Sequence, residues 1–373
     1  MHAAHARTPV AAMAFPVAAL ALVAGLGVGA QWLAAAPPWV DGAGVPALAG
    51  AVLIGAVFAA LHHGEVVAAR IGEPFGTLVM TIAVTTIEVA IVASLMLHGE
   101  NNPTLAREAV FSVVMIVCTG VVGLCLLTGA LRHHEQDFRT RGTSAFLAAL
   151  TALSVLTLVL PNYTITTKGP TFSPAQLAFV SIVSVLLYGS FLFVETVRHR
   201  TDFLDVWAEA AGAGAHETPS NAQALIGLGW LVASLCGVVF LAKKVAAGVE
   251  DALEGAGLAR PDALVGAVIA LLVLMPEILS AVRAAAHNKL QTSLNVALGS
   301  ALATIGLTIP AVCVVSLVAG RELDLGLETR DSVLLFLTLG LSAVSFGTGR
   351  TNLLTGLVHL VVFAAYVLLL IVP

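Results

Sequence analysis

Apolar residues form long, nearly continuous runs along this chain, with short polar stretches between them. A helix needs about 20 predominantly apolar residues to cross the hydrocarbon core of a bilayer. Eleven runs approach this length, near residues 14–35, 44–61, 75–98, 109–131, 143–160, 175–197, 223–242, 262–284, 292–319, 332–347 and 352–372. We therefore expect an all-α polytopic membrane protein with about eleven transmembrane helices.

The composition supports this class. Of the 373 residues, 58% are apolar and 10% are charged, whereas a soluble domain has roughly 25% charged residues. A soluble fold of this composition would lack the polar side chains to cover its surface, but lipid accepts apolar ones. No basic stripe with interleaved aromatic residues is present, so the partners that we expect are the bilayer and transported ions rather than nucleic acid.

The first run allows two interpretations. It could be a signal peptide, because Arg7 precedes it and Ala34 to Ala36 follow it. Its apolar stretch is long for a signal peptide, which favours a retained span.

The distribution of basic residues predicts the orientation in the membrane. With the N-terminus in the cytoplasm, ten Lys and Arg residues lie on the inner side and seven on the outer side. This excess indicates a cytoplasmic N-terminus and a C-terminus outside.

The longest polar connection, residues 198–222, divides the spans into two sets. It contains scattered acidic residues and glycines, which are typical of a solvated, flexible linker. Spans 2–6 and 7–11 form two sets of five, so the second set enters the membrane from the opposite side. We expect an N-terminal helix within residues 1–43, two inverted halves at 44–197 and 223–373, and a cytoplasmic linker at 198–222.

The two halves resemble each other faintly in sequence. Span 3 contains TIAVTTIEVAIVAS and span 8 contains ALLVLMPEILSAV, and each places one glutamate near its middle. Glu88 follows Thr85 and Thr86, and Glu277 follows Pro276. Spans 3 and 8 are expected to run in opposite directions, so the two glutamates can meet near the midplane.

Glu88 and Glu277 are the acidic residues that we expect deep inside the membrane. A carboxylate at the centre of a lipid-facing helix costs about 3 kcal/mol or more, so it normally faces the interior of a bundle or a watery cavity. No basic residue is predicted at the same depth, and Arg283 lies almost two turns further along. The two acids could be a buried polar pair that specifies helix packing, but unneutralised carboxylates favour a site for protons or a cation.

A cation and protons would compete at such a site. Like charges a few ångströms apart favour protonation, and a hard divalent cation with oxygen ligands would displace those protons. Further oxygens are expected from Thr85, Thr86, Asn295 and Ser300, and from a carbonyl freed by Pro276. Asn295 and Ser300 could equally be small polar packing residues.

Three other features suggest different chemistry. Glu73, followed by proline at the start of span 3, is compatible with an ordinary helix start or with a role at the cytoplasmic mouth. The pairs His62-His63 and His133-His134 raise the alternative of a histidine-dependent membrane metalloenzyme. Neither pair belongs to an HxxHH-type box, so interfacial histidines are the favoured interpretation. We therefore expect neither an enzyme nor a resident cofactor.

Three ordered blocks of the sequence resemble a known family. They are GEPFGTLVMTIAVTTIEVAIVASLM at 72–96, PEILSAVRAAAHNKLQTSLNVALGSALATIGLTIP at 276–310 and FGTGRTNLLTGLVHLVVFAAYVLL at 346–369. They are similar to the corresponding blocks of the bacterial ChaA-type cation/proton antiporters, within the calcium/cation antiporter superfamily. The resemblance implies an eleven-helix fold with two inverted repeats and one ion-coordinating acid in each repeat.

Carried over by motif, those acids are Glu88 in VTTIE and Glu277 in MPEIL. Asn295 and Ser300 in NVALGS resemble the polar ligands of the second repeat. Related calcium/proton exchangers have a GNxxE-type motif, in which Thr85 replaces the asparagine here. The family is associated with efflux of calcium, sodium and potassium, so the identity of the cation stays open.

The sequence thus predicts a secondary Ca²⁺/H⁺ antiporter in a bacterial inner membrane that works by alternating access around Glu88 and Glu277. An Na⁺/H⁺ or K⁺/H⁺ antiporter with the same site is the main alternative. A passive channel fits less well, because a continuous pore does not need one protonatable acid in each repeat.

Overall fold

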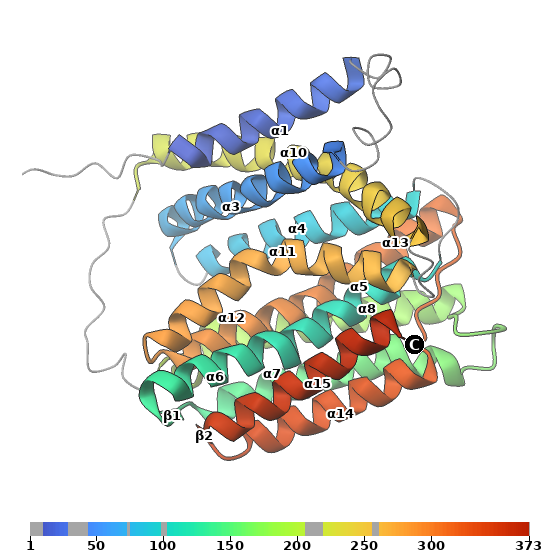
Figure 1. Cartoon of the computed structure of the whole chain (residues 1–373). Coiled ribbons are helices and arrows are strands. Elements are labelled where there is room, and N and C mark those ends of the chain that lie inside the picture. The colour runs from blue at the N-terminus through green and yellow to red at the C-terminus, as the bar shows by residue number, and fades with distance from the viewer. Residues whose placement is uncertain are drawn as a thin grey trace, which may run out of the picture. The chain divides into compact units, whose positions relative to one another are not determined.

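The computed structural model describes residues 10–28, 44–72, 75–97, 103–205, 219–255 and 261–372, and these are almost entirely helical (Figure 1). Nine of the described helices are long and apolar enough to cross a membrane. Two more, α1 (Val10–Val28) and α4 (Phe75–Leu97), have shorter described apolar stretches, Ala12–Leu26 and Thr81–Ala93. The expectation of an all-α polytopic membrane protein is confirmed.

The chain forms two compact units. The first comprises Met1–Ser94 and His216–Gly257, and the second comprises Leu95–Ala215 and Leu258–Pro373. Each unit takes helices from both predicted halves, so the units do not coincide with those halves. The division into two inverted repeats stays a prediction.

In the first unit, α1, α3 (Val45–Ile71) and α10 (Asn221–Gly255) pack against one another. Small residues permit close approach, as is usual between membrane helices. A Cβ added to Gly237 would lie 2.7 Å from the Cβ of Ala19. His63 donates from Nε2 to the carbonyl of Ala12 over 2.9 Å and stacks on Trp230. The first predicted span is therefore an integral part of this unit.

The first unit also contains most of α4, up to Ser94, and the second unit contains the other described α-helices. They are α5 (Leu105–Met115), α6 (Val122–His133), α7 (Thr140–Ser154), α8 (Pro174–Phe193), α11 (Pro261–Ala286), α12 (Leu290–Ala303), α13 (Ile309–Ala319), α14 (Thr329–Phe346) and α15 (Leu353–Ile371). Short 3₁₀ segments lie at η4 (Leu160–Tyr163) and η6 (Arg200–Phe203). Helix α11 packs against α5, α6 and α12, while α15 packs against α6 and α13 packs against α8.

Several spans of this unit contain π-helical segments. Segment η2 (Ile116–Val121) joins α5 to α6, and η7 (Thr304–Thr308) joins α12 to α13. Two others, η3 (Val155–Val159) and η5 (Val194–Arg198), follow α7 and α8. Such segments interrupt the regular hydrogen-bond pattern and are frequent at functional sites. Segments η2 and η7 lie in spans 4 and 9, which follow the two glutamate-bearing spans.

The first part of the predicted linker makes hydrogen bonds with the starts of two helices. Asp205 accepts hydrogen bonds from the backbone N–H of Thr292 (3.1 Å) and from its hydroxyl, and so caps the start of α12. Arg139 donates from Nε to the carbonyl of Leu204 over 3.0 Å. Leu204 and Asp205 are thus hydrogen-bonded to the starts of α7 and α12, while residues 206–218 lie outside the described part of the chain, so the linker stays a prediction.

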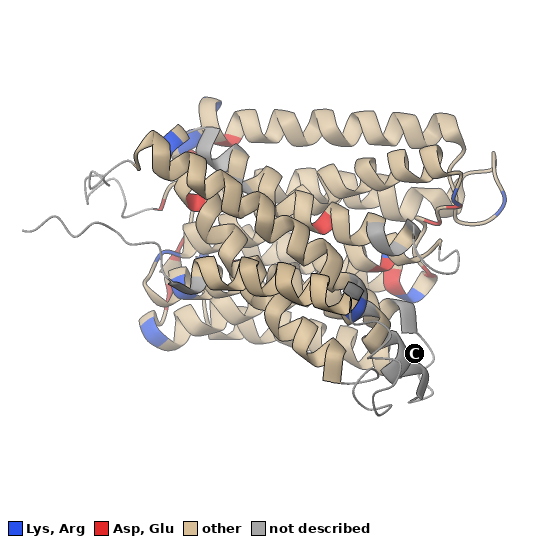
Figure 2. Ribbon diagram, turned by 90° about the horizontal axis from the view of Figure 1, so that it is seen from above, with Lys and Arg blue, Asp and Glu red and all other residues tan. Residues whose placement is uncertain are grey.

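Two connections of the second unit are fixed by polar contacts. Strand β1 (Gln136–Asp137), between α6 and α7, pairs antiparallel with β2 (Arg350–Thr351), between α14 and α15. At the start of α5, Arg107 donates to Glu108 Oε1 from Nη2 (2.9 Å) and Nε (3.2 Å), and to the carbonyl of Gly326 from Nη1 (2.7 Å). The charged residues of the described chain lie mainly near helix ends (Figure 2).

Candidate ion-binding residues

Glu277 lies within α11, directly after the internal Pro276. Its Oε2 is buried and has no hydrogen-bond partner among the described residues. Pro276 has no N–H, so the carbonyl four residues earlier, at Leu272, lacks its regular helical donor. The chain thus places a carboxylate oxygen and a carbonyl oxygen without their usual donors on neighbouring turns of one helix, and oxygens of this kind are ligands for a hard cation.

Asn295 and Ser300 lie on α12, which packs against α11. The Asn295 amide is engaged on both sides: Oδ1 accepts from Gln291 Nε2 (2.8 Å), and Nδ2 donates to the carbonyl of Phe203. The Ser300 side chain is partly exposed, and its carbonyl accepts from the Thr304 hydroxyl (3.1 Å). Asn295 therefore has the contacts of a packing residue, whereas the Ser300 hydroxyl forms no hydrogen bond with the described residues.

Glu88 and Thr85 are buried on α4, with 9% and 6% of their surfaces exposed. They are three residues apart and so share one face of the helix. Thr86 is exposed and donates to the carbonyl of Ile82 over 2.6 Å. The structure thus places Thr85 beside Glu88 and turns Thr86 to another face, while Glu73 lies outside the described residues.

Glu88 belongs to the first compact unit, and Glu277, Asn295 and Ser300 belong to the second. Each set is therefore defined only within its own unit. The meeting of the two glutamates stays a prediction.

Two buried hydrogen-bonded groups near α11 were not anticipated from the sequence. Tyr366 donates to the Ser112 hydroxyl over 2.8 Å. His359, fully buried on α15, donates from Nδ1 to the carbonyl of Cys118 (2.8 Å), and its Nε2 lies 3.0 Å from the Ser345 hydroxyl. The one sequence signal for Tyr366 and His359 is that each is a polar residue inside an apolar run.

The histidine pairs gain no support as metal ligands. His63 and His133 each direct Nε2 to a backbone carbonyl, that of Ala12 and that of Ala286. Across the described residues, no group of three or more His, Cys, Asp or Glu side chains is placed to hold a metal ion. These rings have the contacts of helix-packing residues.

The helices and the buried acids define the class: a polytopic membrane protein with carboxylates inside its spans. The sequence pattern of the family described as "Sodium/calcium exchanger protein" matches residues 42–197 and 226–372. The chain belongs to this family, and with it to the calcium/cation antiporter superfamily.

Curated relatives agree with this membership. The chain is 48% identical over 323 residues to "Putative ionic transporter y4hA" of Sinorhizobium fredii, with 86% of this chain and 87% of the relative covered. It is 35% identical over 318 residues to "Sodium-potassium/proton antiporter ChaA" of Escherichia coli, with 85% and 86% covered. The resemblance to ChaA-type antiporters is confirmed.

Solved structures share the fold. The structure of native YfkE matches with a TM-score of 0.69 at 17% identity, covering 96% of this chain and 100% of that one. The structure titled "Crystal Structure of H+/Ca2+ Exchanger CAX" matches with a TM-score of 0.67 at 13% identity, covering 96% and 88%. At these identities the likeness establishes the architecture alone.

Proposed function

We propose that this protein is a secondary cation/proton antiporter in which Glu88 and Glu277 exchange protons for a cation, with Ca²⁺ as the cargo. The observation that carries the proposal is the buried Oε2 of Glu277, which has no hydrogen-bond donor among the described residues. A buried charged carboxylate without a partner is costly, so the group needs a proton or a cation. Either occupant removes that cost, and their competition couples the two fluxes.

The surroundings of each acid support oxygen-based coordination. Thr85 shares the buried face of Glu88 on α4, and the Leu272 carbonyl and the Ser300 hydroxyl are available in the second unit. Asn295 contributes less directly, because its amide is engaged by Gln291 and Phe203. We therefore assign Asn295 to positioning α12 rather than to binding the ion.

The identity of the cation has a specific alternative. The relative at 35% identity is named a sodium-potassium/proton antiporter, whereas a relative from Aphanothece halophytica at 25% identity is named a Ca(2+)/H(+) antiporter. A monovalent cation needs less negative charge than Ca²⁺ does, so the same acids could serve Na⁺ or K⁺. This is the second candidate function.

The decisive experiment measures proton movement in proteoliposomes on addition of Ca²⁺, Na⁺ or K⁺ at fixed pH. Glu277→Gln and Glu88→Gln should each abolish exchange, because a neutral amide cannot alternate between a proton and a cation. Glu65→Gln, the same chemical change at an exposed position of α3, is the matched control and should retain exchange. Full activity in either of the first two variants would refute the assignment.

Which cation drives proton release separates the two candidates. If one Ca²⁺ releases two protons from the purified protein, both acids serve the same ion. Release by Na⁺ or K⁺ without response to Ca²⁺ would select the monovalent antiporter.

A further inference from the structure

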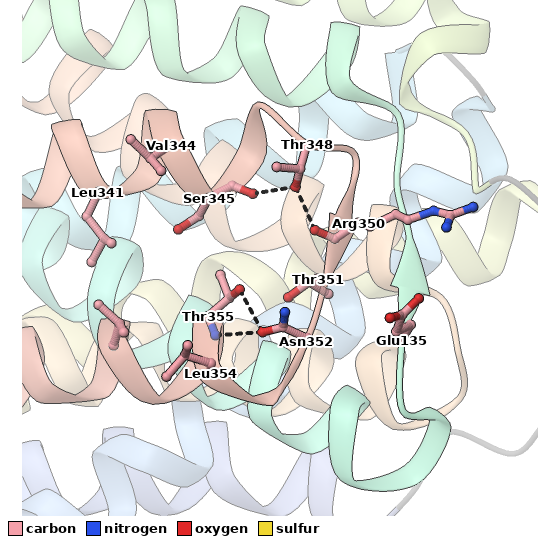
Figure 3. Close-up of a pocket in the computed structure, with 11 residues that line it drawn as sticks. Glu135, Leu341, Val344, Ser345, Thr348, Arg350, Thr351, Asn352, Leu354 and Thr355 are labelled. Atoms are coloured by element: carbon pink, nitrogen blue, oxygen red, sulfur yellow. Dashed lines mark hydrogen bonds between the residues drawn. The ribbon is translucent and has the colours of Figure 1, made fainter.

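A cavity of about 420 Å³ lies within the second unit, where α14 ends and α15 begins (Figure 3). One part of its wall is apolar and consists of Leu341, Val344, Leu354 and Val358. Val344 is 75% exposed and Leu354 is 67% exposed. Since these helices are long and apolar enough to span a membrane, such side chains are expected to contact acyl chains.

The other part of the wall is polar and lies at the helix ends. It includes Glu135, Thr348, Thr351 and Asn352. Thr351 is only 3% exposed, and its hydroxyl has no hydrogen-bond partner among the described residues. A buried hydroxyl without a partner loses its hydrogen bonds to water and gains none from the protein. It therefore marks a position where a bound group would be stabilised.

Two charged residues line this cavity, Glu135 and Arg350. The Glu135 carboxylate forms no ion pair with the described residues, whereas Arg350 is paired through Nε with Asp137 Oδ1 over 3.1 Å. Figure 3 shows the Arg350 guanidinium directed away from the other residues of the cavity. The cavity therefore offers a negative charge that favours a cationic group and opposes a purely anionic one.

The start of α15 offers the complementary feature. Asn352 Oδ1 accepts from the backbone N–H and the hydroxyl of Thr355 (3.1 and 3.2 Å), and the Asn352 Nδ2 makes no hydrogen bond within the described part of the chain. The N-terminus of a helix attracts negative groups such as phosphate. A ligand that fits carries both charges close together and has an apolar tail.

We propose that this cavity binds the headgroup of a zwitterionic aminophospholipid, phosphatidylethanolamine in chemical class. Its ammonium would pair with Glu135, its phosphate would accept hydrogen bonds from Thr351 and the start of α15, and its acyl chains would lie along Val344, Leu354 and Val358. The division between polar and apolar walls coincides with the helix ends, which is the depth of headgroups in a bilayer.

The cavity is connected to the interior through one serine. Ser345 lines the cavity and contacts His359 Nε2, and His359 in turn contacts the Cys118 carbonyl in the π-helical segment η2. A bound lipid would therefore hold the α14–α15 pair beside η2, so we expect it to raise the melting temperature of the protein.

Native mass spectrometry of the full chain in detergent tests the proposal, with phosphatidylethanolamine, phosphatidylcholine and phosphatidylglycerol added separately. Phosphatidylethanolamine should be retained best, because its ammonium can donate hydrogen bonds and the methylated one cannot. Glu135→Gln should weaken its binding about tenfold or more, and Thr351→Val about two- to tenfold, as expected for a charge-assisted and a neutral hydrogen bond. Glu328→Gln, an exposed glutamate at the opposite end of α14, is the control and should bind normally.

Two outcomes would overturn the proposal. The first is retention of phosphatidylglycerol as strong as that of phosphatidylethanolamine with no effect of Glu135→Gln. The second is equally tight binding of soluble phosphoethanolamine, which would mean a polar-ligand site rather than a lipid site. Melting temperatures without added lipid identify a misfolded variant, and Thr351→Val should melt like the parent because its hydroxyl has no partner to lose.

Discussion

The first prediction concerns the contribution of the buried ion pair at the start of α5 to the stability of the second unit. The side chains of Arg107 and Glu108 are 7% and 5% exposed, and Arg107 also donates to the carbonyl of Gly326 in the connection between α13 and α14. We consider Arg107→Met, which keeps most of the apolar stem of the side chain and removes its charge.

The expected loss follows from what Arg107→Met leaves behind. Glu108 becomes a buried charge without its arginine, and removal of one partner of a buried pair typically costs about 3–5 kcal/mol. The Gly326 carbonyl also loses a donor, but this loss is part of the same local rearrangement and is not added separately. We expect a fall in melting temperature of roughly 5–10 °C.

The assay is thermal unfolding of the purified protein in detergent, followed by tryptophan fluorescence. The double variant Arg107→Met with Glu108→Gln should recover most of the loss, because it removes the buried carboxylate that faced the guanidinium. Arg330→Met breaks the exposed pair with Glu328 (2.7 Å) and should cost less than about 1 kcal/mol. A double variant whose loss equals the combined losses of Arg107→Met and Glu108→Gln would refute the reasoning, since independent residues show no coupling.

Three further predictions concern the same unit. Gly266→Val should cost about 1–3 kcal/mol in unfolding free energy, because a Cβ there would lie 3.0 Å from a backbone nitrogen of α5, and Gly340→Val, with open space around it, should be tolerated. Asp205→Ala should lower stability by about 1 kcal/mol in denaturant titration through loss of the α12 cap, and Asp205→Asn should lose less. Burial raises the pKa of Asp324, against the opposing effect of Arg107, so the folded state holds this proton more tightly than the unfolded state. This contribution to stability is present below the unfolded pKa and is lost as pH rises through the folded pKa. Asp324→Asn should therefore raise the melting temperature at neutral pH and leave it unchanged near about pH 3, and an equal gain at both pH values would contradict this.

The spans could be predicted because each depends on local apolar content, and the membrane requires a helix wherever such a run occurs. The two glutamates also followed from sequence, since a charge inside an apolar run is conspicuous. The same logic placed Thr85 beside Glu88, because residues three apart share a helix face.

The remaining contacts depend on partners far apart in the sequence. Asn295 was expected to be a ligand or a packing residue, and only the position of Phe203 shows that its amide nitrogen is already engaged. Asp205 was assigned to a flexible linker because its surroundings are polar, yet it caps a helix that begins 85 residues later, at Leu290. A π-helical segment also shifts the face on which every later side chain lies, which 3.6-residue periodicity does not anticipate.

The short pairing of β1 with β2 has a mechanical consequence. It joins the α6–α7 connection to the α14–α15 connection, with Gln136 opposite Thr351 and Asp137 opposite Arg350. Four helices are thereby joined at one end by a backbone pairing. At the opposite end, the connection before α14 is joined to the segment after α7, because Leu327 N–H donates to the carbonyl of Leu158 over 2.8 Å and Asn162 Nδ2 donates to the carbonyl of Leu327 over 2.6 Å. Because α7 and α14 are tied at both ends, we expect them to move as one body in any transport cycle rather than to separate from each other.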